Sequence, residues 1–232
     1  MKLINIVLLF YFLSHKTFAQ NMMNEEKLWK LIDSVNSVKS ISSKQKEVLL
    51  AQKLSHFSDE DIVMFDLIVN ELHYKADTWD LTAVDKIFTN SVWLSDGHYY
   101  FCFDVISMGK RVYYKVLKNA DELVNHIPDS LPYKNDSYLF DDKDFIVFAG
   151  SNAMKIKYKN EGNYKERIYD TLFTRLEYKL INEKKYKDRD SIYDGYKAKS
   201  LKELQKRLPK IWKRFQKHRD YELLFDEWIK YD

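Results

Sequence analysis

Five residues between positions 74 and 98 have side chains suited to binding or transforming a ligand: Tyr74, Trp79, Asp80, Asp96 and His98. Two carboxylates and an imidazole can accept and donate protons near neutral pH, as a general acid–base hydrolase requires. The two aromatic side chains can pack against a ligand. We therefore treat these residues as a candidate binding site. They become a hydrolase site, with His98 as the acid–base group, if Asp80 and Asp96 form a carboxylate pair beside it.

Asp80 also has a structural interpretation. It lies between Trp79 and Leu81, in a turn of otherwise apolar character. An unpaired carboxylate in such surroundings is costly, so we expect a partner for it. A backbone N–H group, a lysine or a ligand would serve, and we favour a structural hydrogen bond.

The sequence lacks the familiar catalytic and cofactor motifs. It contains no H-E-x-x-H, no paired cysteine motif, no glycine-rich phosphate loop and no G-x-S-x-G, and its histidines lack metal-ligand spacing. Cys102, the only cysteine, is flanked by aromatic residues and is predicted to be a buried, inert thiol. We predict no cofactor and no metal. A non-catalytic domain that binds an unknown protein or small molecule is favoured over a hydrolase.

The elements that must position these residues are predicted to be helices in one mainly α domain. Hydrophobic residues make up 45% of the chain, while only 5 glycines and 3 prolines occur. Ser58 precedes three acidic residues, which is typical of a capped helix start because the helix dipole favours acids there. The next apolar residues recur at helical spacing. They are Ile62, Phe65, Val69 and Leu72.

The two ends of the chain carry different signals. Lys2, an uncharged apolar run and Thr17-Phe18-Ala19 predict a signal peptide over residues 1–19, cleaved after Ala19. We therefore expect a periplasmic or secreted protein, with a helical domain over residues 20–195. Residues 196–232 are predicted to be a basic amphipathic helical tail packed on that domain.

The basic tail bears on the choice of partners. Its apolar stripe is regular enough to need a protein core, so docking on the domain is favoured over contact with a membrane surface. The net charge of +3 is too small to imply a polyanion, and no nucleic-acid partner is expected.

Three segments resemble a known family. Leu28–Asp33 reads L-W-K-L-I-D, Tyr74–Ala83 reads Y-K-A-D-T-W-D-L-T-A, and Arg207–Trp212 reads R-L-P-K-I-W. These are similar to the F-W-x-L-I-D, Y-x-W-D-L-W-x-A and R-x-P-x-L elements of DUF4240, an uncharacterised, mainly bacterial family. The resemblance runs from Leu28 to about Phe215 and implies a helical fold.

The chain departs from the family pattern at residues that carry chemistry. Ser95 and Asp96 fall on the family's two acids, but Cys102 replaces its arginine and Asp104 its tryptophan. Thr82 replaces the second tryptophan of the W-D-L-W element. Half of the arginine–carboxylate arrangement is therefore lost, and the resemblance implies no shared activity.

Residues 98–117 fit two local structures. Y-Y-F-C-F-D-V-I-S and R-V-Y-Y-K-V-L are rich in strand formers, and Gly109 between them could turn a hairpin, giving an α+β alternative. The apolar residues also recur at helical spacing, as Tyr99, Phe103 and Ile106 show. The family resemblance favours helices here.

Overall fold

The structure is a computed structural model that describes residues 22–89, 96–127, 145–159, 164–183, 198–217, 220–222 and 225–226. Over these ranges the chain forms α-helices and one 3₁₀ helix, without a strand, which confirms the predicted mainly α single domain. The helices are α2 (Glu25–Asn36), α3 (Ser43–Leu54), α4 (Asp59–Ala76), α5 (Trp79–Thr89), α6 (Asp96–Ser107), α7 (Lys110–Lys118), the 3₁₀ helix η1 (Ala120–His126), α8 (Ala149–Tyr158), α9 (Tyr164–Asn182), α10 (Leu201–Arg207) and α11 (Pro209–Phe215).

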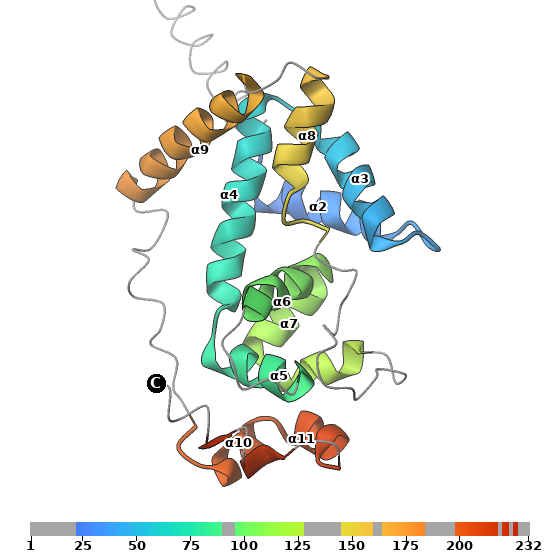
Figure 1. Cartoon of the computed structure of the whole chain (residues 1–232), viewed down its shortest axis with the longest axis vertical. Helices are drawn as coiled ribbons and strands as arrows, with labels where there is room; N and C mark the ends of the chain where they lie inside the picture. The colour runs from blue at the N-terminus through green and yellow to red at the C-terminus, as the bar shows by residue number, and fades with distance from the viewer. Residues whose placement is uncertain are drawn as a thin grey trace, which may run out of the picture.

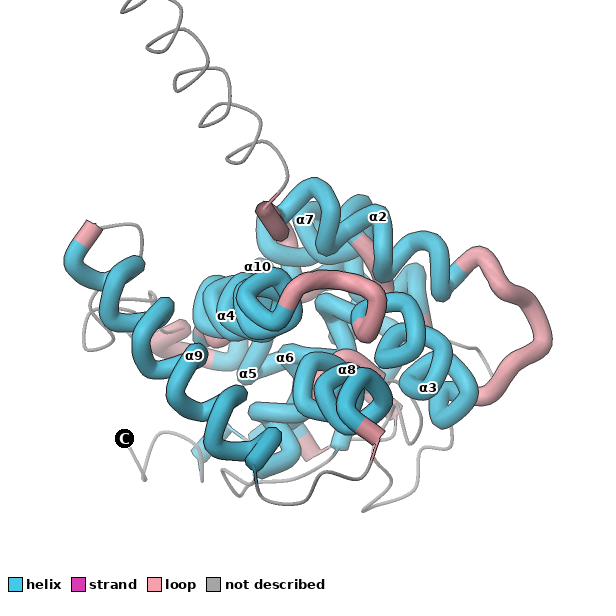
Figure 2. The backbone as a smooth tube through the Cα atoms, turned by 90° about the horizontal axis from the view of Figure 1, so that it is seen from above, coloured by secondary structure: helices cyan, strands magenta, loops and turns pink. Residues whose placement is uncertain are grey.

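Helix α4 is the long element on which the other helices assemble. Helices α2, α6, α8 and α9 all pack against it, and α3 packs against α8 and α2. Figures 1 and 2 show α9 on one side of α4 and the α3–α8 pair on the other. Helices α5, α6 and α7 lie together below this group in Figure 1, with α10 and α11 beneath them.

The start and the buried face of α4 follow from its sequence. The Ser58 hydroxyl accepts a hydrogen bond from Asp61 N at 3.1 Å, and Asp59, Glu60 and Asp61 occupy the first turn. The helix dipole is stabilised by acidic residues at this end, as predicted. The four predicted core residues are at most 2% exposed: Ile62, Phe65, Val69 and Leu72.

The hairpin alternative for residues 98–117 is wrong. The segment forms α6 and α7, which meet at Gly109. Gly109 has φ of +92°, and a Cβ there would lie 2.6 Å from Asp33 Oδ1, so both conformation and space favour glycine. Packing overrides strand propensity because the two helices bury most of their apolar side chains in the common core. These buried side chains are Phe101, Cys102, Phe103, Val105, Ile106, Tyr113 and Val116.

The last described helices join the same hydrophobic core. Pro209 is the first residue of α11, where its missing N–H costs nothing. The buried Asp121 carboxylate on η1 accepts hydrogen bonds from the backbone N–H groups of Lys210 and Ile211, both at 2.9 Å to Oδ1. A side chain from a distant element therefore caps α11. The buried apolar residues of this region are Leu204, Leu208, Ile211 and Phe215.

Among the helices described, none is both long enough and apolar enough to cross a bilayer. The predicted signal peptide over residues 1–19 lies outside the described residues.

Candidate functional site

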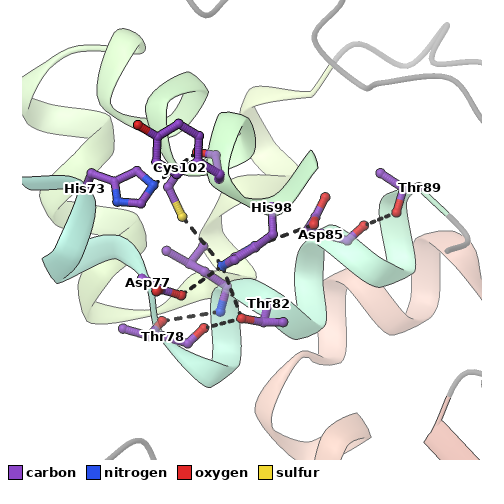
Figure 3. A network of polar contacts seen from close by, with 10 residues as sticks. His73, Asp77, Thr78, Thr82, Asp85, Thr89, His98 and Cys102 are labelled. Carbon is purple, nitrogen blue, oxygen red and sulfur yellow. Dashed lines mark hydrogen bonds and ion pairs between the residues drawn. The ribbon is translucent and has the colours of Figure 1, made fainter. Parts of the chain in front are cut away.

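A buried polar cluster is centred on His98, where α5 and α6 pack together beside the end of α4 (Figure 3). Thr82 and Asp85 are three residues apart and share one face of α5. His98 and Cys102 are four apart and share one face of α6. Asp77 follows the last residue of α4. Three helices thus bring two carboxylates, a hydroxyl and a thiol to one imidazole.

The hydrogen-bond geometry assigns a proton to His98 Nε2. This atom lies 3.2 Å from Asp77 Oδ1, 3.2 Å from Thr82 Oγ1 and 3.6 Å from Cys102 Sγ. The Thr82 hydroxyl already donates to the Thr78 carbonyl at 3.0 Å, so it can only accept from the imidazole. Nε2 therefore acts as a donor.

The second imidazole nitrogen faces another carboxylate. Nδ1 of His98 lies 3.5 Å from Asp85 Oδ2, which is an ion-pair distance but too long for a good hydrogen bond, and Nδ1 has no hydrogen-bond partner among the described residues. Both side chains are well buried, at 13% and 10% exposure. A proton on each ring nitrogen would give each carboxylate a positively charged partner.

Electrostatics favour this doubly protonated form. Burial opposes the charge on the imidazole, but the contacts with Asp77 and Asp85 outweigh it and raise the pKa of His98 to about 12. In turn, the hydrogen bond from His98 holds the pKa of Asp77 below its ordinary value. A histidine that stays protonated at neutral pH has no free lone pair, so it cannot serve as a general base.

Cys102 does not complete a catalytic arrangement. Cysteine, histidine and aspartate in contact resemble the composition of a thiol-protease triad, in which the thiolate is the nucleophile. Here the thiol is completely buried, and burial raises the pKa of Cys102 despite the nearby imidazolium. The thiol is therefore protonated and out of contact with solvent, and it fills space in the core as predicted.

Asp80 and Trp79 belong to a second contact, made with the C-terminal segment. Arg207 Nη2 lies 2.6 Å from Asp80 Oδ2, and Arg207 Cζ lies 5.5 Å from the centre of the Trp79 ring. The partner expected for Asp80 is thus an arginine, rather than a backbone group, a lysine or a ligand. The ion pair ties α5 to α10 across 127 residues of sequence.

The remaining predicted site residues lie elsewhere. Tyr74 is half-buried near the end of α4, where its ring meets His73 edge-on at 5.9 Å. His73 in turn contacts the Tyr99 carbonyl at 3.2 Å. Asp96 is the first residue of α6, but its side chain lies outside the described residues.

The structure therefore divides the predicted site. It joins Trp79 to Asp80 through Arg207 and places His98 with Asp77 and Asp85, which sequence reasoning had not selected. The spacing of Thr82 with Asp85, and of His98 with Cys102, was a signal that these pairs share helix faces. Nothing in the local sequence indicated that the two faces meet.

In the described ranges, no three His, Cys, Asp or Glu side chains are arranged to hold a metal ion.

Comparison with known proteins gives a family but no function. No curated protein and no solved structure matches the chain. Residues 23–152, more than half of the chain, match the family described as "Protein of unknown function (DUF4240)". The match includes the first two segments that carried the resemblance and ends before the third, at Arg207–Trp212. The chain belongs to the DUF4240 family.

Proposed function

We propose that this protein is an exported, non-catalytic binding domain. The observation that carries the proposal is the environment of His98. Its imidazole is only 13% exposed, and both ring nitrogens face carboxylates of the protein, with Nε2 at 3.2 Å from Asp77 and Nδ1 at 3.5 Å from Asp85, which leaves neither nitrogen directed at a substrate. The cluster links the end of α4 to α5 and α6 and acts as a structural connection.

The contacts of Asp80 support the same proposal. A hydrolase with His98 as the acid–base group needs Asp80 directed toward the imidazole and the substrate. Instead, one Asp80 oxygen binds Arg207 at 2.6 Å. On α5, Asp80 and the His98 partner Thr82 are two residues apart, a spacing at which side chains do not face each other. Asp80 therefore serves the docking of α10.

The export part of the proposal is supported by the sequence of residues 1–19. A positive start, a short apolar run and small residues before Gln20 are typical of a cleaved signal. Mass spectrometry of protein from the periplasm or medium should give a chain that begins at Gln20. An intact Met1 on protein found in the cytoplasm would contradict export.

The non-catalytic part is tested with the mature chain and two variants, Asp80→Asn and His98→Gln. Chromogenic esters, phosphoesters and glycosides, together with a fluorogenic peptide library, cover the main hydrolase classes. We expect no turnover that depends on either residue. Asp80→Asn should lower the free energy of unfolding by about 1 kcal/mol, because its ion pair is partly exposed.

Lys44→Met is the matched control, since it removes one partner of an exposed ion pair on another helix. The proposal would be overturned if the native chain and the control both hydrolysed a substrate, while Asp80→Asn and His98→Gln folded but had both lost that activity.

A further inference from the structure

A cavity of about 330 Å³ opens between α2, α3, the α6–α7 junction and the end of η1. Its volume is at the lower end of the range of ligand pockets, which is about 300–1,000 Å³. Its lining contains both polar and apolar residues. The polar ones include Lys46, Ser43 and His126, and the apolar ones are Met108, Val112 and Phe145.

Lys46 is the charged group of the cavity. Its Nζ lies 3.1 Å from Asn36 Oδ1 and 5.7 Å from the centre of the Phe145 ring. Asn36 donates its Nδ2 to the Ser107 carbonyl at 2.7 Å, and this bond fixes its Oδ1 toward the lysine. An ammonium has three N–H donors, so two remain after the bond to Asn36.

No carboxylate neutralises this ammonium within the described residues. Glu47 is adjacent in sequence, but its carboxylate binds Lys44 and Asn152, both at 2.8 Å. Asp33, one turn before Asn36, is exposed and lies against Gly109 outside the cavity lining. Among the described residues that line the cavity, Lys46 therefore supplies an unneutralised positive charge.

The start of α3 adds to this positive character. Ser43 is the first residue of α3, and the first turn of this helix holds no acidic residue. Ser42 and Gln45 form a capping box that pairs two backbone N–H groups here, but no acidic side chain of this turn balances the positive end of the helix dipole. The imidazole of His126 supplies a further polar group, which can donate a hydrogen bond from a ring nitrogen.

We infer that this cavity binds a small organic carboxylate with a short apolar or single-ring body. The carboxylate takes the two remaining donors of Lys46 and the Ser43 hydroxyl, and the apolar body contacts Met108, Val112 and Phe145. The inference rests on the proposed binding function and adds a ligand class to it. The site is distinct from the His98 cluster and from the Asp80–Arg207 pair.

The test uses the mature chain labelled with ¹³C at the methionine methyl groups, and benzoate as the probe. Met108 lines the cavity, whereas Met64 and Met154 lie elsewhere and serve as internal references. We expect the Met108 methyl resonance to shift with a Kd on the order of 1 mM, typical of a fragment of this size. Benzyl alcohol has the same ring without the charge and should bind at least about tenfold more weakly.

Two variants complete the test. Lys46→Met removes the ammonium, keeps an apolar stem and should weaken benzoate binding at least about tenfold. Lys44→Met removes a charge from the same helix outside the cavity and should leave binding unchanged. The inference is overturned if Met108 does not shift up to about 10 mM benzoate, if benzyl alcohol binds as tightly, or if Lys46→Met binds as well as the native chain.

These outcomes are separate from those that test the proposed function. Hydrolysis that depends on Asp80 and His98 would refute the non-catalytic proposal whatever benzoate does. Failure of benzoate to bind would refute the carboxylate site while leaving the non-catalytic proposal intact.

Discussion

Two acidic residues, Asp66 in the middle of α4 and Asp77 just after its end, are stabilised in different ways. At one end, Asp77 meets His98 and keeps its charge because the imidazolium lies beside it. In the middle, Asp66 is 8% exposed and accepts hydrogen bonds from the Gly150 N–H, at 3.2 Å, and from the Tyr169 hydroxyl. No cation contacts the Asp66 carboxylate in the described part of the chain.

The pKa values differ accordingly. Burial raises the pKa of Asp66 to about 7, although the hydrogen bonds from Tyr169 and Gly150 oppose this shift. Asp77 has a lowered pKa, because the hydrogen bond from His98 outweighs burial. Neutral donors alone thus leave a buried carboxyl able to hold its proton near pH 7, whereas a cationic partner keeps it ionised. Each prediction below tests that difference.

The largest effect should come from removing both carboxylates of the His98 cluster. The double variant Asp77→Asn, Asp85→Asn removes both counter-ions of a largely buried imidazolium, which must then lose its proton or stay charged without a partner, and loss of a buried ion-pair partner costs about 3–5 kcal/mol. We expect that decrease in the free energy of unfolding, measured with urea at pH 7. The pKa of His98, followed by NMR, should fall well below about 12, since burial lowers it and only the contact with Cys102 would remain to raise it.

The matched control for this variant is Asp33→Asn, Asp170→Asn, which removes two exposed carboxylates. It should change stability by less than about 0.5 kcal/mol. If the cluster variant lost no more stability than this control, the two carboxylates would not stabilise His98 in the fold.

The next effect concerns pH. The pKa of Asp66 is 3.8 in the unfolded chain and about 7 when folded, so its stabilising contribution is complete below pH 3.8 and is lost as pH rises to about 7. For His98 the values are 6.5 and about 12, so its contribution is lost as pH rises through that higher window. The two sites therefore reduce stability in successive pH ranges.

Two variants separate these ranges in urea unfolding between pH 4.5 and 10. Asp66→Asn should remove a slope on the order of 1 kcal/mol per pH unit below pH 7 and leave the slope above it. His98→Gln should remove the slope above pH 7 and leave the slope below it. A native chain whose stability is constant from pH 4.5 to 7 would show that Asp66 is ionised in the fold.

A smaller effect is expected from Gly150→Ala on α8. A Cβ at this position would lie 2.1 Å from Asp66 Oδ2, so α8 must move away from α4 or the carboxylate must turn. Overpacking of this kind costs about 1–3 kcal/mol. Lys155→Ala, an exposed change on the same helix, is the control.

A double-mutant cycle tests whether the Gly150→Ala effect arises at the carboxylate. In the background of Asp66→Ala the clash is absent, and Gly150→Ala should then cost less than about 0.5 kcal/mol. An unchanged cost in that background would mean that the alanine disturbs α8 itself and not its contact with Asp66.

The sequence predicted the helices better than the contacts between them. The cap at Ser58 and the apolar spacing of α4 are local signals, and the structure confirms both. Residues 98–117 were ambiguous because aromatic and β-branched residues suit a strand as well as a buried helix face. The choice between them depends on α4, α5 and α7, which no local window contains.

The site was harder to predict, because its partners are distant in sequence. Asp80 required a partner by its surroundings, but Arg207 lies 127 residues away. His98 was selected for its chemistry alone, and the carboxylates that stabilise its protonated form come from α5 and the end of α4. Residue type indicates which protonation states and contacts are possible for a side chain, whereas the tertiary contacts decide which of them it adopts.

The smallest effect, and the most direct test of the Asp66 site, is Tyr169→Phe on α9. The change removes one hydrogen-bond donor and little volume, so it should cost about 0.5–1.5 kcal/mol at pH 5, where Asp66 is protonated. At pH 8 the loss should be larger, because the missing donor stabilises the ionised carboxylate and its removal raises the pKa of Asp66 further. Tyr178→Phe removes a hydroxyl from a side chain on the same helix that is 68% exposed, and should have no effect at either pH. Equal losses for Tyr169→Phe at pH 5 and pH 8 would show that the hydroxyl does not distinguish the two forms of Asp66. The contrast with the charged His98 cluster would then depend on burial and on the hydrogen bond from the Gly150 N–H.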